Sequence, residues 1–139
     1  MLKRIAVASI VLTLVVAGAA FAATLTGTKV TLHSTSLGKR LATSTGRTLY
    51  LYTSDTTNHS NCTGGCASSW PPLITRAKPV AGMGISQMHL ATTKRSNGAL
   101  QVTYYGHPLY RWTGDTAAGQ TTGEGLSNFY TVTAAGKKG

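Results

Sequence analysis

The sequence predicts a small all-β domain made of two tandem related repeats with a pseudo-two-fold arrangement, after an N-terminal signal helix. Segments 46–56 and 106–116 share the pattern Leu-Tyr-x-(Tyr/Trp)-x-x-Asp-Thr. Short runs rich in β-branched and aromatic residues alternate in polarity, and Gly, Asn and Ser separate them. Alternation with a period of two is typical of half-buried strands, whereas helical periodicity is absent beyond the N-terminal segment.

Strands are expected where the alternation is clearest, at residues 29–34, 38–43, 47–53, 89–94, 99–105, 108–113 and 128–133. Thr45-Gly46 and Asn97-Gly98 are turn signals, and Asn-Gly between strands favours a type I′ hairpin. Gly106-His107-Pro108 is a further turn, since Pro108 has a fixed φ and no N–H. Region 54–88 is expected to be a mostly irregular loop that needs internal ties.

The N-terminus has the organisation of an export signal. Lys3 and Arg4 precede an uncharged apolar run, and Ala20-Phe21-Ala22 offers a small-x-small cleavage site. We therefore expect a signal peptide at 1–22 and a secreted domain at 23–139. An uncleaved anchor is the alternative, although the apolar run is short for a spanning helix of about 20 residues. Within the domain, the repeats are expected at about 38–73 and 98–133, joined through 74–95.

The chain is strongly basic, with 13 Lys and Arg against 3 Asp and Glu and a formal net charge of +10. Such a balance favours anionic surroundings. The cations are scattered, and no recognised nucleic-acid motif accompanies them. Anionic cell-envelope polymers or a membrane surface are therefore the expected partners, and no specific nucleic acid is expected.

Two of the three carboxylates, Asp55 and Asp115, occupy the same position of the repeat. Each is expected to organise a loop by accepting N–H groups, or to meet a Tyr hydroxyl or an Arg. The alternative is a glycan-acting hydrolase, because paired acids about 5–9.5 Å apart cleave glycosides. No Gly-x-Ser-x-Gly motif is present, which disfavours a serine hydrolase.

The only two cysteines, Cys62 and Cys66, flank Thr-Gly-Gly. In an exported chain a disulfide is the expected state. The alternative is a copper-binding or thiol-redox module, because thiolate and thioether ligands suit Cu(I). Its candidate ligands are His59, Cys62, Cys66, Met83, Met88 and His89. Apart from copper, no cofactor is expected.

The aromatic residues admit two interpretations. Tyr50, Tyr52, Tyr110 and Trp112 fall on one face of the repeat strands, and Trp70 precedes two prolines. Large aromatic side chains usually bury and form core. The same rings could instead present an exposed platform for sugars or polyanions, so the motif residues Asp55 and Asp115 together with these aromatics are the candidate binding residues.

Three stretches carry a resemblance to a known family, namely residues 46–55, residues 62–73 from Cys62 to Leu73, and residues 101–115, followed by Gly119, Gly123 and Gly125. They are similar to the predicted lipoproteins marked by a Tyr-x-(Phe/Trp/Tyr)-x-x-Asp motif, the secreted repeats of unknown function. The resemblance covers nearly all of the chain after residue 22. It implies two tandem copies, export and envelope association, without established catalytic residues.

The chain departs from that family pattern in two places. No Cys follows the apolar run, so the protein is expected to be soluble or signal-anchored rather than lipid-modified. Arg-x-Asp-Gly is replaced by Arg95-Ser96-Asn97-Gly98, and a Trp near the end by Phe129. We therefore expect an exported protein, extracellular, periplasmic or in the cell envelope, that acts as a non-enzymatic binding or structural module. A copper or thiol-redox module and a glycan-acting hydrolase are the alternatives.

Overall fold

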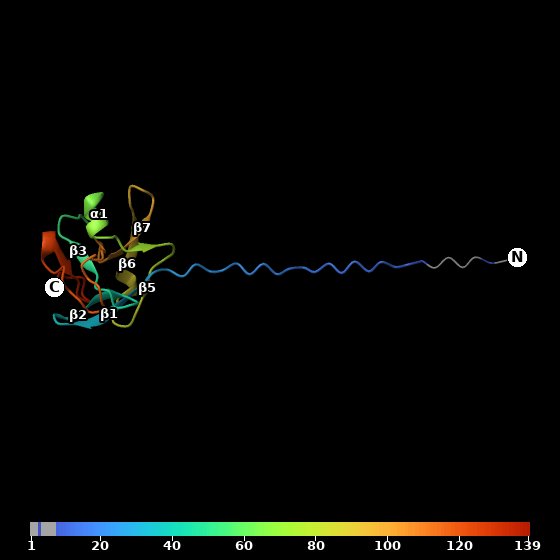
Figure 1. Ribbon diagram of the computed structural model, residues 1–139, viewed down its shortest axis with the longest axis horizontal. Coiled ribbons are helices and arrows are strands. Elements are labelled where there is room, and N and C mark those ends of the chain that lie inside the picture. The colour runs from blue at the N-terminus through green and yellow to red at the C-terminus, as the bar shows by residue number, and fades with distance from the viewer. Residues whose placement is uncertain (1–2, 4–7) are drawn as a thin grey trace.

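The computed structural model describes residue 3 and residues 8–139. Residues 8–28 form neither helix nor strand, and residues 8–26 extend away from the folded domain (Figure 1). The expected signal helix is thus not present over 8–22, and the rest of the predicted signal peptide, 1–2 and 4–7, lies outside the described residues. An apolar segment with no surface to pack against lacks the tertiary contacts that supply most helical stability. In the described part of the chain, no helix is both long and apolar enough to span a bilayer.

The folded domain is mostly β with short helical turns, so the predicted all-β class is confirmed. The strands are β1 (Lys29–Thr35), β2 (Gly38–Thr43), β3 (Tyr50–Tyr52), β4 (Ile74–Thr75), β5 (Val80–Ala81), β6 (Leu90–Lys94), β7 (Leu100–Tyr104), β8 (His107–Pro108) and β9 (Phe129–Thr131). The helical turns are α1 (Gly65–Ser69), η1 (Gln87–His89) and η2 (Leu126–Asn128).

The strands form small sheets with mainly antiparallel pairing. One sheet has the order β2-β1-β5, with β1 antiparallel to β2 and parallel to β5. A second pairs β3 with β9, and a third has the order β4-β7-β6 with β8 added to β7. In the longest pairings, Leu32 lies opposite Leu41 and Thr92 lies opposite Val102.

At the centre of the contact between the two repeats, Tyr50 of the first pairs with Tyr110 of the second. Tyr50 N donates to Tyr110 O at 2.8 Å, and Tyr110 N donates to Tyr50 O at 2.9 Å. Such a mutual exchange is the hydrogen-bonded pair of an antiparallel ladder. Because Tyr50 and Tyr110 hold the same position in their repeats, a pseudo-two-fold axis passes between them.

Alternation along the repeat strands divides the interior into two cores. Leu49, Leu51 and Leu109 belong to an aliphatic cluster that also contains Val30, Leu41, Leu73, Ile85, Leu90, Val102, Tyr104 and Val132. Tyr50 and Tyr110 point the other way, into an aromatic cluster with Cys62, Trp70 and Phe129. Successive strand residues face opposite sides, so one short motif contributes to both cores.

Two hairpin turns differ from the expected assignment. Gly98 has φ of 85° while Asn97 does not adopt a positive φ, and Gly98 N donates to Arg95 O at 2.9 Å. Type I′ requires positive φ at both central residues, so the predicted type I′ turn at Asn97-Gly98 is wrong. A type I′ turn occurs instead at Tyr105-Gly106, with φ of 48° and 79°.

The strand expected at 108–113 is mostly irregular. Only His107–Pro108 pairs as a strand, and beyond it Tyr110 forms isolated bridges to Tyr50 and Pro72. The strand expected at 47–53 is likewise reduced to Tyr50–Tyr52. In both segments the regular ladder covers only two or three residues, although the side chains still alternate between the two faces.

Candidate functional site

The shared motif folds into two reciprocal Tyr–Asp pairs. Tyr50 Oη donates to Asp115 Oδ2 at 2.6 Å, and Tyr110 Oη donates to Asp55 Oδ2 at 2.7 Å. Each tyrosine is therefore bound by the carboxylate of the other repeat. Together with the Tyr50–Tyr110 backbone pair, these side-chain hydrogen bonds join the two repeats.

The second oxygen of each carboxylate fixes a loop. Asp115 Oδ1 accepts from Thr122 N at 2.9 Å and from Thr122 Oγ1 at 2.6 Å. Asp55 Oδ1 accepts from Asn61 N at 2.7 Å. The donors lie six or seven positions further along the chain rather than in the next residues, so each carboxylate closes a wide loop instead of a local Asx-type turn.

Burial changes the ionisation of the reciprocal Tyr–Asp pairs. It raises the pKa of Tyr50, and the hydrogen bond and charge of Asp115 raise it further. Burial also raises the pKa of Tyr110. Desolvation raises the pKa of Asp55, against the opposing effects of the Asn61 N–H and the Tyr110 hydroxyl. Both tyrosines consequently remain hydrogen-bond donors throughout the physiological pH range.

A column of four aromatic rings crosses the aromatic core. Tyr52 stacks on Phe129 at 4.3 Å between ring centroids, and Phe129 stacks on Trp70 at 3.8 Å. Trp112 lies against the other face of Trp70 at 4.4 Å, with the two rings tilted by 30°. Trp70 and Phe129 are buried, whereas Tyr52 and Trp112 are half-buried at the ends. These end residues hold the same position in their repeats, so each repeat offers one partly accessible ring.

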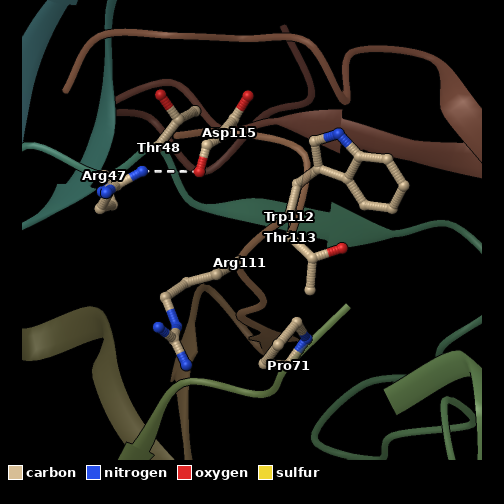
Figure 2. A pocket seen from close by; sticks show the side chains of 7 residues that line it. All are labelled: Arg47, Thr48, Pro71, Arg111, Trp112, Thr113 and Asp115. Carbon is tan, nitrogen blue, oxygen red and sulfur yellow. Dashed lines mark hydrogen bonds between the residues drawn. The ribbon is translucent and has the colours of Figure 1, made fainter. Parts of the chain in front are cut away.

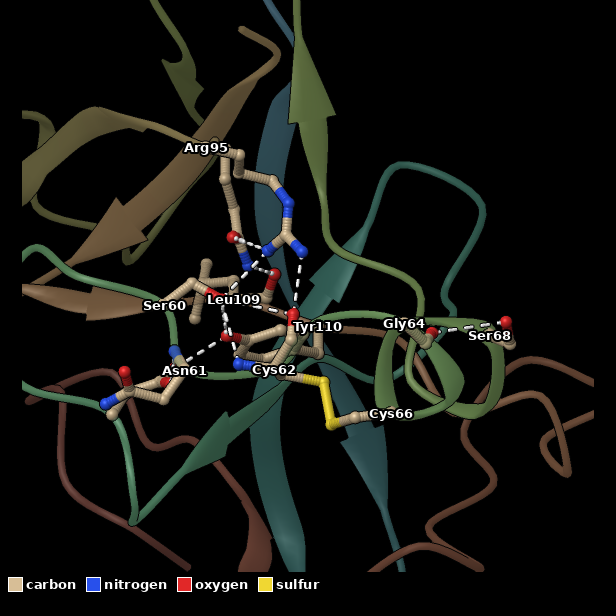
Figure 3. The surroundings of a disulfide bond; sticks show 11 residues. Ser60, Asn61, Cys62, Gly64, Cys66, Ser68, Arg95, Leu109 and Tyr110 are labelled. Atoms are coloured by element: carbon tan, nitrogen blue, oxygen red, sulfur yellow. Dashed lines mark hydrogen bonds between the residues drawn. A yellow bond between two sulfur atoms is a disulfide. The ribbon is translucent and has the colours of Figure 1, made fainter. Parts of the chain in front are cut away.

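Cys62 and Cys66 form the predicted disulfide, which is confirmed (Figure 3). The loop they close leads into α1, where Trp70 N donates to Cys66 O at 2.8 Å. The half-buried Arg95 holds the same loop: its Nη2 donates to Cys62 O at 2.7 Å and its Nη1 to Ser60 Oγ at 2.9 Å. The cross-link thereby fixes the chain just before the buried Trp70.

Replacing both cysteines with serine is expected to lower the free energy of unfolding by about 2 kcal/mol, the chain-entropy value for a loop of about five residues. The corresponding fall in Tm is about 8 °C. Thermal unfolding followed by circular dichroism measures it. Reduced wild-type protein is the control and should melt with the variant. A variant that melts like the oxidised wild type would contradict a stabilising role for the disulfide.

The metal-ligand candidates are spread over several environments. The Cys62 and Cys66 sulfurs are joined to each other, His59 is exposed, and Met83 and Met88 are 94% and 86% exposed. His89 stacks on Tyr105 with 3.7 Å between ring centroids. In residues 3 and 8–139, no three or more His, Cys, Asp or Glu side chains gather as a metal site. A thiolate copper site requires the disulfide to be reduced, and copper binding stays a prediction.

Two surface pockets occupy corresponding places in the two repeats. The Trp112 pocket, of about 270 Å³, is lined by Arg111, Trp112, Thr113 and Asp115 of the second repeat and by Arg47 of the first (Figure 2). The Tyr52 pocket, of about 260 Å³, is lined by the corresponding Leu51, Tyr52, Thr53 and Asp55 and by His107. Each pocket therefore combines the motif of one repeat with a basic side chain of the other.

The two pockets differ in the cations they present. The Trp112 pocket has two guanidinium groups, from Arg47 and Arg111. The Tyr52 pocket has Leu51 in place of Arg111 and His107 in place of Arg47, with Lys137 and Lys138 added from the C-terminal segment. Burial, and then the charge of Lys137, lower the pKa of His107, so this imidazole is held mainly neutral.

The side-chain carboxylates are hydrogen-bonded within the protein, while most of the cations are exposed. Asp55, Asp115 and the third carboxylate, Glu124, accept hydrogen bonds from Tyr hydroxyls, from a Thr hydroxyl and from main-chain N–H groups. No Lys or Arg in the described chain donates a hydrogen bond to a carboxylate. The basic surface is therefore free to meet anions from solution.

Fold and site together define a two-repeat β-protein whose repeats exchange Tyr–Asp hydrogen bonds and whose outer surface is basic. The family model for a secreted repeat of unknown function matches the chain twice, at residues 31–74 and 91–132. The chain belongs to this family of secreted repeats, and the resemblance drawn from the motifs is confirmed. Comparisons with curated proteins and with solved structures gave no match.

Several residues that build the site were not among the expected ones. Phe129 is the centre of the aromatic column, and Arg95 and Thr122 tie loops to the core. Gln101 is fully buried and donates to Leu109 O at 2.8 Å. Of these residues, only Gln101 lies within an alternating run that the sequence predicts as a strand, that of β7.

Proposed function

We propose that the protein is an exported, non-enzymatic module that binds anionic polymers at the cell envelope. The observation that carries this proposal is the division of charge: uncharged donors bind every carboxylate, and no Lys or Arg in residues 3 and 8–139 donates a hydrogen bond to one. Most of the basic side chains are exposed, among them Lys39, Arg76, Lys94, Arg111 and Lys137. Such a surface attracts polyanions over about 8–10 Å at moderate ionic strength.

Glycan hydrolysis has less support than binding. A general acid or nucleophile needs a carboxylate that can reach the substrate. Asp55 and Asp115 line separate pockets, and both oxygens of each are hydrogen-bonded within the protein. Drawing either carboxylate away from its tyrosine would break a hydrogen bond that joins the repeats. The closed disulfide weakens the copper alternative, because neither sulfur is then a free thiolate. A thiol-redox role stays a prediction, since a disulfide is the oxidised state of such a pair.

Co-sedimentation with insoluble polymers tests the proposal. The secreted protein is expected to sediment with a carboxylated polymer and to stay in solution with a neutral polymer of the same backbone. Binding should fall steeply as salt is raised from about 0.05 to 0.5 M, because exposed charges are screened. Release of reducing ends is measured in the same tubes. Equal binding to both polymers, or reducing ends that accumulate with time, would overturn the proposal.

A further inference from the structure

We infer that the Trp112 pocket is a binding site for a carboxylated sugar residue of an acidic polysaccharide. The inference rests on the proposed function, because it specifies where and how one unit of a polyanion is held. It adds that one of the two corresponding pockets is specialised, so that the chain has one selective site in addition to its general charge.

The first argument is the pair of arginines. Figure 2 shows the Arg47 and Arg111 side chains on one side of the pocket. Arg47 is held in place because Nη1 donates to Asp115 O at 2.6 Å, and its other nitrogens stay available. Arg111 is exposed, and its side chain donates no hydrogen bond within the described chain. Planar guanidinium groups match a carboxylate in bidentate geometry, and Arg is preferred over Lys for that purpose.

The second argument is the opposite wall. Trp112, Thr113 and Pro71 line the pocket across from the guanidinium groups (Figure 2). Trp112 is supported from behind by Trp70, with 4.4 Å between ring centroids. A pre-formed wall of aromatic and apolar surface with a few polar groups is typical of small-ligand sites. This wall can pack against the C–H face of a sugar ring, and the Thr113 hydroxyl can form a hydrogen bond with a hydroxyl of the sugar.

Asp115 also lines this pocket and is the one group there that would repel an anion. Its carboxylate accepts three hydrogen bonds, from the Tyr50 hydroxyl and from Thr122 N and Oγ1. Asp115 is 7% exposed, so its charge is directed into the protein. Two guanidinium groups facing the pocket against one engaged carboxylate leave a net attraction for a single carboxylate ligand.

The Tyr52 pocket is the internal comparison. Leu51 stands where the Trp112 pocket has Arg111, and the largely neutral His107 stands where it has Arg47. Its charge comes from Lys137 and Lys138, point charges on flexible stems that do not form a planar fork. The difference predicts one selective uronate site for each chain rather than two.

Nuclear magnetic resonance titration with a trimer of galacturonic acid tests the inference. The chain has two tryptophans, so two indole N–H signals report on the pocket wall and on the buried column. The Trp112 signal is expected to shift several-fold more than the Trp70 signal, with one site per chain. The methyl-esterified trimer, which lacks the charge, should produce no saturable shift.

Two variants of equal charge separate the pocket from the general surface. Arg111→Leu introduces the residue that the first repeat has at this position, and both Arg111 and Arg76 are exposed. Losing charge-assisted hydrogen bonds should weaken trimer binding about tenfold or more in Arg111→Leu. Arg76→Leu, which removes one charge outside the pocket, should change binding less than about twofold. Unchanged melting curves establish that both variants are folded.

Each other outcome has a defined meaning. Equal weakening by Arg111→Leu and Arg76→Leu, or equal binding of inorganic tripolyphosphate, would overturn the uronate site and leave general polyanion binding intact. An unshifted Trp112 signal in a protein that still sediments with carboxylated polymer would do the same. Failure of both the titration and the sedimentation would overturn the inference and the proposed function together.

Discussion

Phe129→Ala is expected to lower the free energy of unfolding by about 3–5 kcal/mol, the usual cost of removing a large buried aromatic ring. Phe129 is 1% exposed and stacks on Tyr52 and Trp70 while Tyr110 meets its edge. Small domains are stable by only about 5–15 kcal/mol. The variant should therefore melt at least about 12 °C below the wild type. Urea unfolding followed by tryptophan fluorescence measures the loss.

Two matched variants serve as controls for this measurement. Phe129→Leu keeps most of the buried volume and should cost markedly less than Phe129→Ala. Leu126→Ala lies in the neighbouring η2, where Leu126 is 45% exposed, and should change stability by no more than about 0.5 kcal/mol. A Phe129→Ala protein as stable as Leu126→Ala would show that the aromatic column does not hold the domain together.

The parts of the fold that sequence predicts well are those where alternation continues for five or more residues. β1, β2, β6 and β7 lie within one residue of the expected positions, because each is paired along its length and needs one buried face. β3 and β8 are shorter than expected, since the chain there exchanges partners around the Tyr50–Tyr110 pair. Alternation records which side of the chain is buried, but not how long the backbone stays paired.

Contacts between residues far apart in the chain are harder to predict from the sequence. The repeated motif predicts two like halves, yet its Tyr and Asp could equally pair within a repeat. The cross-repeat choice follows from the Tyr50–Tyr110 backbone exchange, which no local pattern encodes. Helix α1 is stabilised by the disulfide loop rather than by a periodic apolar face, and it contains no buried residue. The sequence of α1 therefore has no periodic apolar pattern from which a helix could be predicted.

In the candidate site, too, some residues could be singled out from the sequence and others could not. Trp112 and Asp115 stand out in the sequence because they recur at equal positions. Arg47 and Arg111 stand out only as members of a scattered set of cations, and the fold brings them to one pocket across the pseudo-two-fold axis. The sequence thus indicates the motif residues of the site. The pairing of Arg47 with Arg111 depends on the fold, because the two arginines come from different repeats.

Asp115→Ala is expected to lower the free energy of unfolding by at least about 3 kcal/mol. The change leaves the fully buried Tyr50 hydroxyl without its carboxylate and removes two hydrogen bonds from Thr122. Stranding a buried donor costs about 1–3 kcal/mol, and hydrogen bonds to a charged acceptor contribute about 1.5–3 kcal/mol each. Asp55→Ala should cost less, because Asp55 is more exposed and desolvation of its carboxylate already opposes its hydrogen bonds. Chemical denaturation measures both.

Double-mutant cycles then distinguish Tyr–Asp hydrogen bonds between the repeats from Tyr–Asp hydrogen bonds within each repeat. Tyr50→Phe should couple to Asp115→Ala, and Tyr110→Phe to Asp55→Ala, by about 0.5–3 kcal/mol, because each pair shares one hydrogen bond. The within-repeat combinations, Tyr50→Phe with Asp55→Ala and Tyr110→Phe with Asp115→Ala, should add within about 0.5 kcal/mol. Coupling confined to the within-repeat combinations would mean that each repeat is closed on itself. The cross-repeat pattern instead makes each half incomplete alone, since the buried tyrosine of one repeat finds its acceptor only in the other.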